Sequence, residues 1–93
     1  MRIIGYIEHP ILKITVFKMG NKISIKFESG LYEQTYKLRS GEAVSTLADV
    51  EKIVDDTFCN EVLHILNQMH SIKNQAMIRA LPTAPQEEFE EII

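Results

Sequence analysis

Hydrophobic and polar residues alternate with a period of two through most of residues 3–38, and a helical pattern follows. Period-two alternation is typical of strands that bury one face. Gly20-Asn21 and Ser29-Gly30, two dipeptides that readily adopt positive φ, interrupt the alternation and predict two tight hairpins. We therefore expect an antiparallel meander of four strands, which span residues 3–8, 12–18, 22–28 and 31–38.

The two hairpin turns predict a register for three of these strands. With the first dipeptide as the loop, Ile14 lies opposite Phe27, and with the second dipeptide as the loop, Phe27 lies opposite Tyr32. This register turns the amide of Gln34 inward, where we expect it to reach water at an edge of the sheet. The predicted buried face consists of Leu12, Ile14, Val16, Ile23, Ile25, Phe27, Tyr32, Tyr36 and Leu38.

The opposite face of the sheet is expected to be polar, with Lys26 opposite Glu33. The simplest register of the first strand adds Ile4 and Tyr6 to this face, near Phe17. Lysines interleaved with aromatic rings are one way in which proteins hold single-stranded nucleic acid, although the glutamates here would repel a polyanion. This alternative function would use Tyr6, Lys13, Phe17 and Lys26.

Two helices are predicted after the strands. Thr46, followed three residues later by Asp49, has the form of a capping box that begins a short helix. Asp55 and Asp56 then begin a long helix that spans residues 57–81 and stops at Pro82. Apolar residues follow each other at spacings of four and three along this helix, and they are Phe58, Val62, Ile65, Met69, Ile72 and Ala76.

The long helix should extend beyond the sheet. About 25 residues at about 1.5 Å each give roughly 37 Å, whereas a strand of about eight residues spans roughly 26 Å. Exposed apolar surface on the projecting part would mark an interface, and an antiparallel pair of helices from two copies would cover it. A helix packed entirely within one chain is the alternative. The candidate interface residues are Met69, Ile72, Ala76, Met77, Leu81 and Phe89.

Composition places the chain among ordinary soluble proteins. Its 93 residues allow one domain over residues 1–81, followed by an acidic, proline-containing tail over residues 82–93 that either stays flexible or folds back. Residues 1–42 carry seven basic and four acidic side chains, and the remainder carries three basic and nine acidic ones. We expect a cytoplasmic protein, because no apolar run is long enough for a membrane span or a signal peptide.

No catalytic or metal-binding pattern is apparent in the sequence. His64 and His70 are six residues apart on a helix, which points them about 120° from each other, so they cannot share a metal ion. Cys59 adjoins the apolar stripe and is expected to be a buried thiol. We therefore expect no enzyme activity and no cofactor.

The sequence thus predicts an α+β domain in which a four-stranded meander packs one face against a short and a long helix. The expected function is a non-catalytic interaction module, homodimeric through the long helix, with protein partners. Single-stranded nucleic-acid binding through the outer face of the sheet is the alternative.

Overall fold

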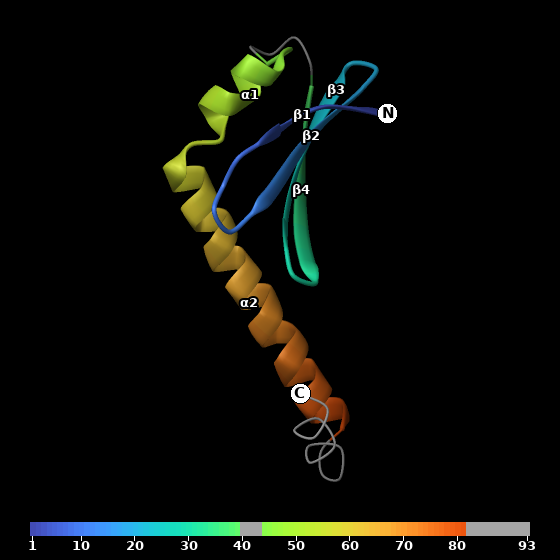
Figure 1. Cartoon of the computed structure of the whole chain (residues 1–93). Helices are drawn as coiled ribbons and strands as arrows, with labels where there is room; N and C mark the ends of the chain where they lie inside the picture. Colours follow the sequence, from blue (N-terminus) through green and yellow to red (C-terminus); the bar gives the residue numbers. More distant parts are fainter. Residues whose placement is uncertain (40–43, 82–93) are drawn as a thin grey trace.

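The protein has the α+β architecture expected, with a four-stranded antiparallel sheet and two helices on one of its faces (Figure 1). The computed structural model describes residues 1–39 and 44–81. The sheet has the order β1-β2-β3-β4, so that each strand pairs with the next along the chain. The elements are β1 (Arg2–Ile7), β2 (Lys13–Met19), β3 (Lys22–Ser29), β4 (Tyr32–Arg39), α1 (Leu47–Ile53) and α2 (Asp56–Ala80).

The register of the first hairpin is as predicted, and that of the second differs by two residues. Ile14 pairs with Phe27 across β2 and β3. Across β3 and β4, however, Phe27 pairs with Gln34 instead of Tyr32. The second loop is Gly30-Leu31, because the glycine with positive φ occupies the first loop position, as Gly20 does in the other hairpin. A shift of two residues keeps every side chain on its predicted face.

The first strand also departs from the simplest register, because its pairing with β2 shifts between Ile3 and Gly5. Ile3 consequently lies opposite Phe17. Ile4 is partly buried against the core, which corrects its predicted place on the polar face. Tyr6 pairs with Thr15 and does lie on that face.

The core lies between the sheet and the two helices. Leu12, Ile14, Val16, Ile23, Ile25 and Phe27 of the predicted buried face are all buried, whereas Tyr32 and Leu38 are partly buried and Tyr36 is 38% exposed. The helices contribute Val50, Cys59, Val62 and Leu66 to the same cluster, and the C-cap of α1 contributes Val54. Burial of these side chains is the main stabilising term of the fold.

Both helices begin at the predicted caps. The hydroxyl of Thr46 accepts a hydrogen bond from the amide of Asp49, whose carboxylate in turn accepts from the amide of Thr46, and this is a complete capping box. Asp55 caps α2 by accepting from the amide of Phe58 at 2.9 Å. The caps satisfy backbone donors that a helix cannot satisfy itself.

The long helix projects well beyond the sheet (Figure 1). The chain has principal extents of 53 × 25 × 19 Å and a radius of gyration of 17.2 Å. A compact chain of this length would have a radius of gyration of about 12 Å. The predicted tail, including Phe89, and the predicted helix stop at Pro82 lie outside the described residues.

Candidate functional site

Strand β4 fixes the position of α2 through three polar and aromatic side chains. The amide nitrogen of Gln34 donates to the carbonyl of Val62 at 2.9 Å, and the hydroxyl of Tyr36 donates to Oε1 of Gln34 at 2.8 Å. The hydroxyl of Tyr32 lies 2.8 Å from Nδ1 of His70. Gln34, the misfit of the predicted buried face, therefore joins the sheet to the helix by a specific hydrogen bond.

The contact between sheet and helix ends near His70 and Lys73. The ammonium of Lys73 lies 5.3 Å from the centre of the Tyr32 ring, and Tyr32 is the first residue of β4. We define the overhang as residues 71–81, the part of α2 and its C-cap that follows His70. None of the described core residues belongs to it. The projection predicted from the lengths of helix and strands is therefore present.

The overhang carries large exposed apolar side chains. Ile72 is 67% exposed and Ile78 is 54% exposed, and Ala76 is also exposed. Met77 and Leu81 are half-buried, and Met69, just before the overhang, packs partly against the core. Five of the six predicted interface residues are thus described, and Ile72 is the most exposed of the large ones.

The predicted heptad stripe of α2 divides between the core and the surface. Val62 is buried, whereas Ile65 is 41% exposed. The buried positions Cys59 and Leu66 show that the core lies to one side of the predicted stripe. We define the α2 seam as Ile65, Met69, Ile72 and Ala76, which continue the stripe. Ile65, Ile72 and Ala76 are exposed, and Met69 is half-buried.

The face of the sheet opposite the helices is a second exposed surface, which we call the open face. The four predicted nucleic-acid residues all lie on it, because the strand pairings place Tyr6, Thr15 and Lys26 in one row and Phe17 and Lys13 in the neighbouring rows. The ammonium of Lys26 lies 5.5 Å from the centre of the Phe17 ring and 3.5 Å from Glu28. The open face also carries Lys22, Lys37 and Arg39, which the period-two alternation of β3 and β4 places on the same side as Lys26 and Thr35.

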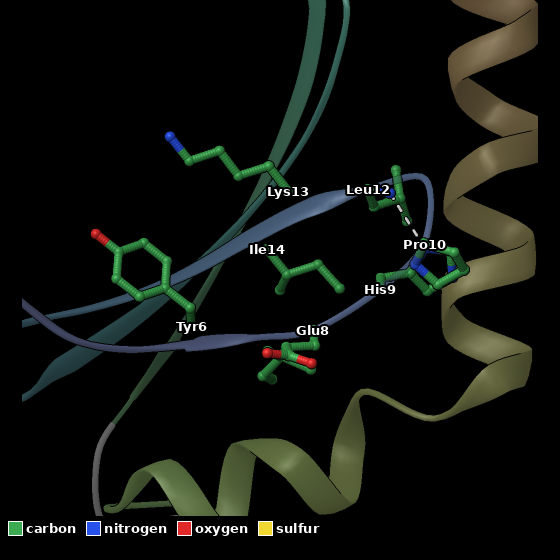
Figure 2. A pocket seen from close by; sticks show the side chains of 8 residues that line it. Tyr6, Glu8, His9, Pro10, Leu12, Lys13 and Ile14 are labelled. Carbon is green, nitrogen blue, oxygen red and sulfur yellow. Dashed lines mark hydrogen bonds between the residues drawn. The ribbon is translucent and has the colours of Figure 1, made fainter.

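A shallow hollow of about 520 Å³ lies at the turn between β1 and β2 (Figure 2). Tyr6 and Lys13 project from its rim away from the helices, and His9 lies in the turn. Nδ1 of His9 accepts hydrogen bonds from the amides of Ile11 and Leu12, both at 3.1 Å. His9 therefore holds the turn in shape.

Cys59 is the other candidate reactive group. Cys59 is 4% exposed, and burial, followed by the carboxylates of Asp56 and Asp55, raises the pKa of its thiol. Over residues 1–39 and 44–81, no three His, Cys, Asp or Glu side chains come close enough to hold a metal ion. Within the same ranges, neither helix is long and apolar enough to cross a membrane.

Comparison with protein-family models, curated proteins and solved structures gives no match to this chain.

Proposed function

We propose that the chain is a non-catalytic interaction module that forms a homodimer through the α2 seam. The observation that carries the proposal is the 67% exposure of Ile72 on a helix that continues beyond the sheet. Exposed apolar side chains at heptad spacing are typical of a helix that packs against another helix.

The seam is self-complementary when two copies of α2 run antiparallel. With the two-fold axis between His70 and Ser71, Ile65 lies level with Ala76 of the second copy. Met69 then lies level with Ile72 of the second copy. A large side chain therefore meets a small one at the Ile65–Ala76 pair, and two large side chains meet at the Met69–Ile72 pair near the axis. Such alternation of sizes lets side chains interdigitate across a two-fold interface.

The charges on α2 also favour a second copy as the occupant. Lys73 is the only Lys, Arg, Asp or Glu between positions 62 and 78. Like-charge repulsion between two copies of the helix is therefore small. In the same antiparallel arrangement Glu61 lies within one residue of the level of Arg79 of the second copy, so opposite charges flank the apolar contact.

Ile72→Asp tests this proposal, with Ile78→Asp as its matched control. Both isoleucines are exposed on the overhang, but six positions place them about 120° apart around the helix, and only Ile72 belongs to the seam. We expect sedimentation equilibrium to give wild type and Ile78→Asp a mass of about twice 10.7 kDa. Ile72→Asp should weaken the dimer at least roughly tenfold, because a carboxylate would be buried in an apolar contact.

Two results would contradict the proposal. One is a wild-type mass that stays at that of a single chain up to the highest soluble concentration. The other is equal dissociation by the two aspartate variants, which would show a general effect of charge on the overhang and no specific seam.

A further inference from the structure

Acidic and basic residues of the open face occupy different positions along the strands. The row at the end of the sheet that contains Lys13 also contains Glu28 and Glu33. The remaining three rows of paired residues contain four basic side chains and no acidic one, and these are Lys22, Lys26, Lys37 and Arg39. The register of β4 is decisive here, because it places Thr35 opposite Lys26 where Glu33 was predicted.

Within these three rows, the basic side chains and the aromatic side chains lie on different strands. All four basic side chains belong to β3 and β4. The exposed aromatic and apolar side chains belong to β1 and β2, where Tyr6 is 57% exposed, Ile3 is 49% exposed and Phe17 is half-buried. Adjacent strands are about 4.8 Å apart, so a basic track runs directly beside an aromatic one.

We propose that these three rows bind single-stranded nucleic acid, with its backbone along β3 and β4 and its bases on β1 and β2. Lys37 and Arg39 are about 6.6 Å apart along β4, and Lys22 and Lys26 are about 13 Å apart along β3. These cations would neutralise phosphates along the two strands. The rings of Tyr6 and Phe17 would stack with bases, an interaction that tolerates any sequence because every base has a π-face. The ammonium of Lys26 lies over the Phe17 ring, 5.5 Å from its centre, and 3.5 Å from Glu28. A base that stacks on this face of Phe17 would displace the ammonium and leave it beside the phosphates.

Nucleic acid fits this surface better than an acidic protein segment does. An acidic peptide would use the basic track alone, whereas the exposed rings beside it provide the stacking surface that a base requires. The paired cations Lys22 and Arg39 form the row farthest from Glu28 and Glu33, so the basic track continues to that end of the sheet.

Fluorescence anisotropy with a labelled oligothymidylate of about 12 nucleotides, long enough for an extended site, tests the proposal. We expect affinity to fall steeply between about 50 and 200 mM salt, because binding releases counterions. Lys37→Gln and Arg39→Gln should each weaken binding and reduce the slope of log K against log salt by about 0.7 per lost phosphate contact. Tyr6→Leu should weaken binding about fivefold or more without changing the slope.

Lys52→Gln is the matched control, because it removes the same charge from an exposed position of α1, on the other side of the sheet. It should leave affinity and slope unchanged. Equal weakening by Lys52→Gln and Lys37→Gln, or affinity that does not depend on salt, would overturn the proposal. A polyglutamate peptide that binds more tightly than the oligonucleotide, and through the same residues, would assign the surface to an acidic protein instead.

Discussion

At Gly5, the side chain of Leu47 from α1 packs closely against β1. Gly5 pairs with Val16 on the buried face, and a β-carbon at position 5 would lie 3.3 Å from Cγ of Leu47 and closer still to its methyl groups. The side chain of Leu47 occupies the space that any other residue would need. Glycine is required here for close packing and not for backbone conformation.

Gly5→Ala should therefore destabilise the protein by about 1 kcal/mol, the lower end of the cost of overpacking. In a Leu47→Ala background the same change should be neutral or stabilising, because the obstruction is gone and alanine restricts the unfolded chain. Urea denaturation of the four variants measures the coupling. Equal effects of Gly5→Ala in both backgrounds would contradict the contact.

Cys59 offers a second test at the scale of one residue. Its burial, with the carboxylates of Asp56 and Asp55 nearby, raises the pKa of the thiol and keeps it protonated. We expect iodoacetamide to alkylate Cys59 roughly tenfold or more slowly in the native protein than in urea. A thiol introduced by Ala48→Cys, at an exposed position of α1 away from the α2 seam, should react at similar rates in both states. Rapid native alkylation of Cys59 would show that α2 opens readily from the sheet.

At the scale of the element, the start of α1 depends on one carboxylate. The carboxylate of Asp49 accepts from the amides of Ser45 at 3.0 Å and Thr46 at 3.1 Å. These hydrogen bonds hold the pKa of Asp49 below its ordinary value of 3.8, and the one from Ser45 has the largest effect. Because the folded pKa is the lower one, the stabilisation is complete above the unfolded pKa and is lost as the pH falls through the folded pKa.

Asp49→Asn, which has the shape of the protonated acid, should therefore be less stable than wild type at neutral pH. The difference in the free energy of unfolding should shrink as the pH falls below about 3.8. Urea denaturation of both proteins at several pH values measures this. A difference that is independent of pH would show that the charge of Asp49 does not stabilise the cap.

The same elements show what the sequence predicts and what it leaves open. Caps and turns are local, so Thr46, Asp55 and Gly20 mark their elements correctly. The register of β4 could not be chosen from the pattern, because a shift of two residues leaves each side chain on its own face. The irregularity beside Ile4 was also not apparent, since two adjacent isoleucines suit either face.

At the scale of the whole molecule, the two proposed surfaces lie on different parts of the fold. The α2 seam follows a helix that continues past the sheet, and the open face lies on the side of the sheet away from both helices (Figure 1). The seam was predicted from the spacing of apolar residues and the length of the helix. Its exposed side could not be predicted, because whether Ile65 or Leu66 faces the core depends on how Gln34 and Tyr32 hold the helix.

The measurement that most directly tests the antiparallel dimer is a pair of spin-label distances, taken between copies labelled at one site each. Labels on Ser71→Cys and, separately, Ala80→Cys would be introduced with Cys59→Ala as the background. The dimer predicts a short distance at position 71, near the roughly 10 Å between packed helices, and about 30 Å at position 80. Equal distances at both positions, or no coupling between labels, would contradict it.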